Sequence, residues 1–159
     1  MAADSKLKIT PVETAADLIA IRELFLEYAR SLNFSLCFQG FDQELASLPG
    51  DYAPPAGRLL LAEFYGRRAG CVAMHRLEEG ICEMKRLYVQ PEFRGMGLGR
   101  MLAEAIVREA KNTGYQKMRL DSLTSLKEAA ALYRSLGFVE IPPYRYNPLP
   151  GAVFLELVL

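Results

Sequence analysis

The residues from 83 to 114 read EMKRLYVQPEFRGMGLGRMLAEAIVREAKNTG, and this stretch decides the fold of the chain. A strand-like segment passes Pro91 and enters RGMGLGR at 94–100, where glycines alternate with larger residues before a segment with helical spacing of apolar residues. Glycine allows sharp turns and a close approach of other groups to the backbone. A helix start also presents unsatisfied N–H groups with partial positive charge. The combination predicts a phosphate-binding site at the start of this helix.

Two common phosphate-binding loops do not match this stretch. A Walker P-loop needs Lys and then Ser or Thr after its last glycine, whereas Arg100 and Met101 stand there. A dinucleotide-binding loop needs its third glycine one residue later, inside a parallel strand–helix–strand unit. A glycine-rich helix start that binds no ligand remains the alternative to a different class of phosphate site.

Length and composition limit the class of protein. The 159 residues suit one domain, 1–159, with a core of its own. Acidic and basic residues number 19 each, which argues against nucleic acid as a partner. No apolar run reaches the roughly 18 residues of a membrane span, and the first ten residues do not resemble a signal peptide. We therefore expect a cytoplasmic protein without a membrane partner.

The cysteines and the single histidine do not have the spacing of a metal site, so we expect no bound metal. Cys37, Cys71 and Cys82 lie in apolar surroundings, which is typical of inert core thiols in the cytosol. His75 is expected on a strand near a turn, with substrate contact as the less favoured alternative.

Apolar periodicity and turn residues predict a mixed α/β chain. Three strands joined by tight turns between residues 58 and 89 form an antiparallel meander, and a strand–helix–strand crossover follows. Thr14 or Asp17 caps the first helix, and Gly114 ends the third. The predicted strands are 7–12, 58–65, 67–77, 80–89, 115–123, 138–141 and 152–159, and the predicted helices are 14–32, 41–48, 95–112 and 125–137.

Two motifs at a characteristic separation resemble one enzyme family. RGMGLG at 94–99 matches the R/Q-x-x-G-x-G/A signature of the GNAT superfamily, the acetyl-CoA-dependent N-acetyltransferases, and EAAALYRSLGFVEI at 128–141 resembles the family's A-x-x-L-Y-x-x-x-G-F helix. The resemblance covers residues 81–141 and implies an α/β (α+β mixed) fold. That fold has a mostly antiparallel sheet of six to seven strands flanked by helices, and one splayed strand pair forms the acetyl-CoA slot.

The resemblance also implies an activity, the direct transfer of an acetyl group from acetyl-CoA to a primary amine of a small molecule or peptide, without a metal. A non-catalytic acyl-CoA-binding or sensor module on the same fold is the alternative. Backbone N–H groups of the glycine loop are implied to bind the pyrophosphate, and the preceding strand is implied to bind the pantetheine arm. Many relatives carry Asn where this chain has Leu126, so Ser125 or a backbone group is expected to compensate. The implied cofactor-binding residues are Leu87, Tyr88, Val89, Arg94, Gly95, Met96, Gly97, Leu98, Gly99, Arg100 and Ser125.

Glu83 and Tyr133 are the catalytic residues that the resemblance implies. Glu83 stands where similar acetyltransferases place a general base, although a surface glutamate paired with Lys85 or Arg86 is the alternative. Tyr133 stands where relatives donate a hydrogen bond or proton to the departing sulfur, although an aromatic ring packed on the sheet is the alternative.

The acceptor site is expected between the first two helices and the last strand pair. Arg145 beside two tyrosines can bind a carboxylate, which favours an amino acid or a small acidic amine, and a solvated loop arginine is the alternative. Peptides and aminoglycosides stay open as acceptors. The C-terminal strands and their loop are expected to pair in a homodimer. The candidate substrate residues are Phe34, Phe38, Tyr144, Arg145 and Tyr146.

Overall fold

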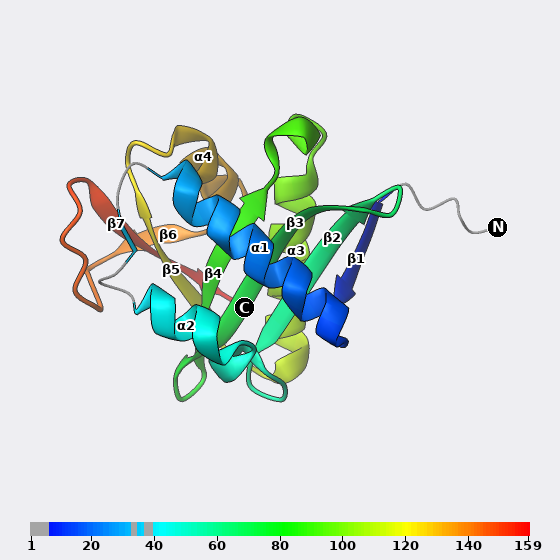
Figure 1. Ribbon diagram of the computed structural model, residues 1–159. Coiled ribbons are helices and arrows are strands. Elements are labelled where there is room, and N and C mark those ends of the chain that lie inside the picture. The colour runs from blue at the N-terminus through cyan, green and yellow to red at the C-terminus, as the bar shows by residue number, and fades with distance from the viewer. Residues whose placement is uncertain (1–6, 33–34, 37–39) are drawn as a thin grey trace.

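A computed structural model describes residues 7–32, 35–36 and 40–159. The predicted α/β class is confirmed, because helices and strands alternate along one sheet (Figure 1). The elements are β1 (Leu7–Pro11), α1 (Ala15–Ser31), α2 (Phe41–Ser47), η3 (Gly50–Tyr52), β2 (Arg58–Phe64), β3 (Arg67–Glu78), β4 (Ile81–Val89), η4 (Pro91–Phe93), α3 (Leu98–Thr113), β5 (Lys117–Leu123), α4 (Lys127–Ser135), β6 (Val139–Ile141) and β7 (Ala152–Val158).

The seven strands form one sheet in the order β1-β2-β3-β4-β5-β7-β6. Neighbouring strands are antiparallel except β4 and β5, which pair in parallel and are connected through α3. A parallel pair needs such a long crossover, whereas the meander β2-β3-β4 needs only tight turns. The predicted meander and crossover are both confirmed.

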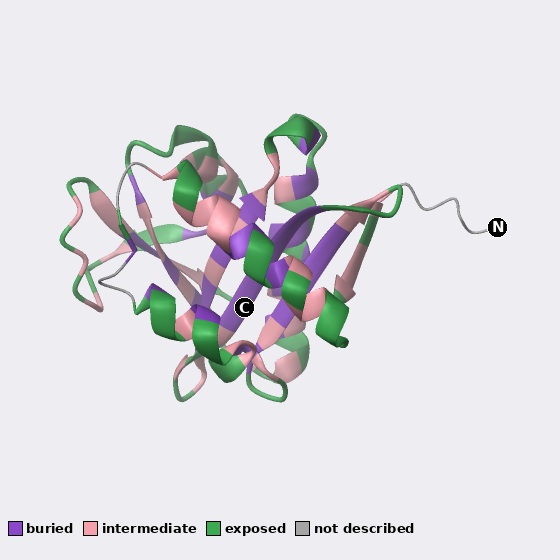
Figure 2. Ribbon diagram, viewed as in Figure 1, coloured by how far each residue is buried: buried purple, intermediate pink, exposed green. Residues whose placement is uncertain are grey.

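Helices cover both faces of the sheet, and each face has its own core (Figures 1 and 2). On one face, α1 contributes the fully buried Ile21, Leu24 and Phe25, and α2 adds Phe41 and Leu45. On the other face, α3 and α4 pack against the sheet through the core residues Leu102, Ala103, Ile106 and Tyr133. Within the described residues, no helix is long and apolar enough to cross a membrane.

Local signals explain where the helices begin and end. Thr14 and Asp17 form a reciprocal capping box at the start of α1, so both predicted capping residues act together. The third helix begins at Leu98 and not at the predicted residue 95, because Gly95 and Gly97 have φ of 83° and are left-handed. Gly114 closes this helix with φ of 102°, as predicted.

The predicted splayed strand pair is β4 and β5. Their pairing covers only Ile81 with Lys117, Cys82 with Met118 and Glu83 with Arg119, while both strands continue for several residues. A bulge also bends β4 away, since two residues, Arg86 and Leu87, lie opposite the single Val72 between the paired positions on β3. Arg86 adopts a left-handed φ of 61°, which is uncommon for a residue with a side chain. The two strands therefore form a fork that opens after Glu83.

Candidate active site

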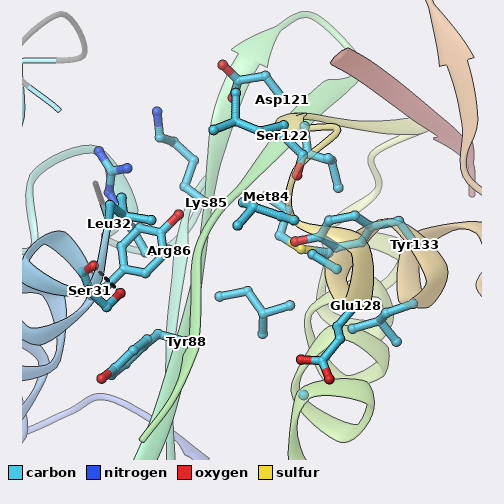
Figure 3. Close-up of a pocket in the computed structure, with 18 of the residues that line it drawn as sticks. Ser31, Leu32, Met84, Lys85, Arg86, Tyr88, Asp121, Ser122, Glu128 and Tyr133 are labelled. Atoms are coloured by element: carbon cyan, nitrogen blue, oxygen red, sulfur yellow. Dashed lines mark hydrogen bonds between the residues drawn. The ribbon is translucent and has the colours of Figure 1, made fainter. Parts of the chain in front are cut away.

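The fork opens into a cavity of about 780 Å³. Strands β4 and β5 form two of its sides, and α1, the loop at 94–99, α4 and the loop between β6 and β7 also contribute to its lining (Figure 3). Pockets of this volume typically bury most of the surface of a drug-sized ligand. The cavity contains most of the predicted cofactor residues and one of the two predicted catalytic residues, as described below.

Side-chain alternation gives the fork two chemically different faces. Beyond the paired Cys82 and Met118, the next residues of the same face are Met84 and Leu120, which belong to the core under α3 and α4 together with Tyr133. Beyond the paired Glu83 and Arg119, the next residues of the opposite face are Lys85 and Asp121. The four residues beyond the pairing, Met84, Lys85, Leu120 and Asp121, line the cavity together with Tyr133 of α4. The cavity therefore passes between the strands from an apolar face with one tyrosine to a charged face.

The glycine loop is open in the way that a phosphate site requires. Among the residues that the structure describes, a Cβ atom built on Gly95 or Gly97 meets no atom within 4 Å, and no side chain caps the first turn of α3. The unsatisfied N–H groups of that turn can therefore bind an anion. Arg94 is fixed beside the loop, because its Nε donates to the Val89 carbonyl at 2.9 Å and its guanidinium lies 5.7 Å from the centre of the Tyr88 ring. These features fit the pyrophosphate of acetyl-CoA.

Other predicted cofactor residues occupy different settings around this loop. Leu98 is buried in a small core, Met96 is 45% exposed, and Arg100 forms a 3.7 Å ion pair with Glu104. The predicted residues that line the cavity are Leu87, Tyr88, Val89, Arg94, Gly95, Gly99 and Ser125, and Leu126 lines it beside them.

Tyr133 lies in α4 on the apolar face of the fork (Figure 3). It is buried, its ring centre lies 5.8 Å from that of Phe138, and it lines the cavity. Tyr133 can therefore pack in the core and contact a ligand in the cavity at the same time. Burial raises the pKa of the Tyr133 hydroxyl, so the group remains protonated at neutral pH and able to donate.

Glu83 lies outside the lining of the cavity. Its side chain is fully buried and accepts from the Tyr144 hydroxyl at 2.7 Å and from Arg145 at 2.6 Å, while His75 Nε2 lies 2.8 Å from its Oε1. Burial alone raises the pKa of Glu83, but the His75 contact, Lys85, Arg145 and Tyr144 lower it below its usual value. Glu83 is not among the residues that line the cavity. Its environment favours the ionised carboxylate and does not expose that carboxylate to the cavity.

Asp121 is the carboxylate of β5 that lines the cavity, and sequence reasoning missed it. One of its oxygens, Oδ2, accepts from Asn147 Nδ2 at 3.0 Å. The available signal was an acidic residue in MRLDSL, on a strand whose buried residues alternate with partly exposed ones, but its importance depends on where the parallel pairing stops. Asn147 and Leu149 are further cavity residues that were not predicted, and both belong to the loop between β6 and β7.

The predicted substrate residues do not form one site. Tyr144 and Arg145 are bound to Glu83, so Arg145 is not a solvated loop arginine, and neither residue lines the cavity. Tyr146 is 76% exposed. Phe34 and Phe38 lie outside the described residues. The loop from 142 to 151 therefore reaches the cavity through Asn147 and Leu149 and is attached to the sheet through Tyr144 and Arg145.

The two cysteines of the described residues are buried and free, as predicted for core thiols. Burial raises the pKa of both, to about 12 for Cys82, so neither is a reactive thiolate. Cys37 lies outside the described part of the chain.

Comparisons with known proteins agree with this geometry. A model of the acetyltransferase (GNAT) family matches residues 18–138. An uncharacterized N-acetyltransferase of Schizosaccharomyces pombe is 41% identical over 155 residues, which cover 96% of this chain and 95% of that relative. An acetyltransferase structure from Streptococcus agalactiae superposes with a TM-score of 0.77 at 18% identity, covering 98% of this chain and 99% of the other. A GNAT acetyltransferase structure from Elizabethkingia anophelis with acetyl-CoA bound superposes with a TM-score of 0.65 at 20% identity, covering 98% and 100%.

Proposed function

We propose a mechanism from one premise: this chain belongs to the acetyltransferase (GNAT) family and is an acetyl-CoA-dependent N-acetyltransferase. The bound cofactor supplies the acetyl group as a thioester, and an amine accepts it. The loop at 94–99 and the first turn of α3 bind the phosphates, and β4 beyond the fork binds the pantetheine arm. Asp121 acts as the general base, Tyr133 acts as the hydrogen-bond donor to the leaving sulfur, and Glu83 positions the acceptor loop.

The observation that carries this assignment is the opposite placement of Asp121 and Tyr133 across the fork. Asp121 belongs to the charged face and Tyr133 to the apolar face, and both line the same cavity. An amine that approaches from the charged face loses its proton to Asp121, directly or through a water. A thiolate that leaves towards the apolar face meets the protonated hydroxyl of Tyr133, which stabilises the developing negative charge.

Glu83 has a supporting role in this proposal. It holds Tyr144 and Arg145, and Asn147 of the same loop donates to Asp121. Holding this loop fixes the orientation of the Asp121 carboxylate, because Asn147 binds Oδ2. The second oxygen, Oδ1, is then left for the proton of the amine. Glu83 is thus a positioning residue in this proposal. Asp121 on the neighbouring strand takes the role of general base that the sequence motif predicted for Glu83.

A screen of free amines with acetyl-CoA, monitored by thiol release, tests this function. Wild type is expected to release thiol with at least one amine, Asp121→Asn is expected to lose most of that rate, and Glu83→Gln is expected to retain more of it. Thiol release at the rate of background hydrolysis with every amine would favour the acyl-CoA-binding module instead. The same rate loss in both variants would contradict the assignment of the base.

A pair of glycine variants tests the cofactor loop. Gly97 and Gly66 both have left-handed φ, of 83° and 78°, and at both positions a Cβ would meet no atom within 4 Å. Valine is strained at either position, but only Gly97 lies at the proposed phosphate site. Calorimetry should show weakened coenzyme A binding in Gly97→Val and retained binding in Gly66→Val. Equal affinity in both folded variants would move the phosphate site elsewhere.

We also propose a homodimer and a cytoplasmic setting. The strand β6 is an edge of the sheet, and Val139 on it is 62% exposed, while Val158 on β7 is 72% exposed. Pairing across this edge would cover both side chains. A monomer mass by light scattering at tens of micromolar would contradict the dimer.

The free thiols of Cys71 and Cys82 are compatible with a reducing compartment, which supports the proposed cytoplasmic setting.

A further inference from the structure

The last turn of α1 forms a wall of the cavity on the charged face of the fork. Lys85 on that face is paired with Ala73 of β3, and Ala73 belongs to the core under α1. Directly paired residues point to the same face of a sheet, so Lys85 and Asp121 lie on the face that α1 covers. Tyr28 lies in this turn of α1, packs against the same core, and lines the cavity. Tyr28 and Asp121 therefore belong to different walls on the same side of the fork.

The ring of Tyr28 is held in place by β4. Its centre lies 5.8 Å from that of the Tyr88 ring, at an interplanar angle of 59°, which is a favourable separation for two aromatic rings. Figure 3 shows Tyr88 on the opposite side of the strands from Tyr133. The Tyr88 hydroxyl donates to Glu27 at 3.3 Å, whereas within the described residues no hydrogen bond of the Tyr28 hydroxyl is found. Packing thus fixes the Tyr28 ring, and its hydroxyl is able to bind a ligand in the cavity.

The Tyr28 hydroxyl is within electrostatic reach of the two groups assigned to the chemistry. Burial raises the pKa of Tyr28, Arg86 counteracts this effect, and Asp121 adds to it. Burial also raises the pKa of Tyr133, and both Tyr28 and Asp121 add to that rise. The Tyr28 hydroxyl is therefore protonated at neutral pH. In that form it can donate one hydrogen bond, and its oxygen can accept another.

We propose that Tyr28 is a further catalytic residue, whose hydroxyl oxygen accepts an N–H bond of the acceptor amine and so orients the amine for attack. This proposal rests on the acetyltransferase function with Asp121 as the base. A neutral primary amine has two N–H bonds and one lone pair, and the lone pair must point to the thioester carbon between the strands. Both N–H bonds then point to the charged side of the fork, where Asp121 and Tyr28 supply oxygen acceptors. Tyr28 neither gains nor loses a proton in this role.

Two cations line the same cavity. Lys85 and Arg86 both interact with other groups of the protein, and Arg86 donates to Glu44 at 2.7 Å. As cations they supply N–H donors, which suit oxygen atoms of a ligand. An N–H bond of the amine requires an acceptor atom instead. The role of Tyr28 therefore depends on neither cation.

The proposed contact predicts a preference for primary over secondary amines. A neutral N-methyl amine has a single N–H bond, which goes to the charged acceptor, Asp121, because hydrogen bonds to ionised groups are the stronger ones. Its methyl group then replaces the N–H bond that would reach Tyr28. N-methylation changes the pKa of the ammonium little, so a lower rate does not come from the protonation state. Steric exclusion of the methyl group would act whether or not residue 28 carries a hydroxyl.

Matched pairs of amines test the proposal. The pairs are alanine with N-methylalanine, tyramine with N-methyltyramine, glycylglycine with sarcosylglycine, and the best primary amine of the thiol-release screen with its N-methyl derivative. Thiol release from acetyl-CoA gives kcat/KM for each amine. The ratio of the two values within a pair measures the preference for the primary amine.

The variant Tyr28→Phe keeps the ring on Tyr88 and removes only the hydroxyl. The value of kcat/KM for primary amines should fall about 3- to 10-fold, the loss of one neutral hydrogen bond, and that for N-methyl amines should fall less than about twofold. The preference for the primary amine should therefore shrink, while KM for acetyl-CoA and the melting temperature should hold. As a control, Tyr65→Phe changes a tyrosine that is 64% exposed and does not line the cavity, so all constants should stay near wild type.

Each outcome decides the proposal. An equal preference for the primary amine in wild type and Tyr28→Phe, or no such preference in wild type, would overturn the role of Tyr28 while leaving the acetyltransferase function in place. A lower melting temperature with the same rate loss for both members of each pair would make Tyr28 a packing residue and would also overturn it. No thiol release with any amine would overturn the proposed function itself, and this inference with it.

Discussion

Glu83 and Asp121 are two carboxylates on the same face of neighbouring strands, yet their surroundings differ in kind. Glu83 lies in the last parallel pair and is enclosed by His75, Tyr144 and Arg145. Asp121 lies two residues beyond the last pair on its strand, accepts one hydrogen bond from Asn147, and lines the cavity. The difference teaches that the point where a strand pairing ends decides which of two carboxylates lines the cavity. The carboxylate within the paired segment, Glu83, instead holds neighbouring side chains in place.

The substitution Asp121→Asn should have the largest effect on turnover. Asparagine keeps the shape but cannot take a proton, so kcat/KM for the amine should fall on the order of 10²- to 10⁴-fold at neutral pH. The rate should recover partly at high pH, where the amine loses its proton to solvent. Steady-state kinetics across pH, with unchanged acetyl-CoA affinity as the control, would check this. A rate near wild type at neutral pH would place the base elsewhere.

Tyr133→Phe should have the next largest effect and should act on the other side of the fork. The ring keeps its packing against Phe138, but the hydrogen bond to the leaving sulfur is lost, so kcat should fall roughly 10- to 100-fold. Acetyl-CoA affinity should hold, because the interaction strengthens as charge develops. If the variant kept its kcat and melted at a lower temperature, Tyr133 would be a packing residue alone.

Glu83→Gln should reduce turnover less than Asp121→Asn, by about tenfold or less. The variant loosens Tyr144 and Arg145, so the main kinetic effect should be a higher KM for the amine. A double-mutant cycle with Asn147→Ala would measure the coupling, since a loop held at both points gives non-additive effects on kcat/KM. Additive effects would separate Glu83 from Asp121. A rate loss as large as that of Asp121→Asn would restore Glu83 as the base.

The smallest expected effect concerns the pH dependence of stability. The folded pKa of Glu83 lies below its usual value of 4.5, so the unfolded chain binds the proton more readily in that range. The contribution of Glu83 to the free energy of unfolding is therefore fully present above about pH 4.5 and is lost as the pH falls through the folded pKa. Denaturant titrations of Glu83→Gln should show a weaker loss of stability below pH 4.5 than wild type. Identical slopes would contradict the lowered pKa.

Local patterns in the sequence predicted much of the molecule. The glycine loop, the capping residues of α1, the meander and the position of Tyr133 all depend on nearby residues, and the structure has each of them. The surroundings of Glu83 and Asp121 depend on contacts between distant segments, because Tyr144 lies 61 residues after Glu83 and Asn147 lies 26 residues after Asp121. The start of α3 at Leu98 also escaped prediction, since the glycine pattern fits a helix entry at several positions.

The short seam between β4 and β5 has a mechanical consequence. Among the described residues, three register pairs join β4 to β5, next to hydrogen bonds from the Gln116 and Lys117 N–H groups to the Gly80 carbonyl, and the fork opens from the end of this short pairing. A small rotation of strands β1 to β4 against strands β5 to β7 about the pair of Glu83 and Arg119 would displace the open ends of β4 and β5 more than it displaces the paired residues. Amide hydrogen exchange at these pairs would report how often the pairing itself opens.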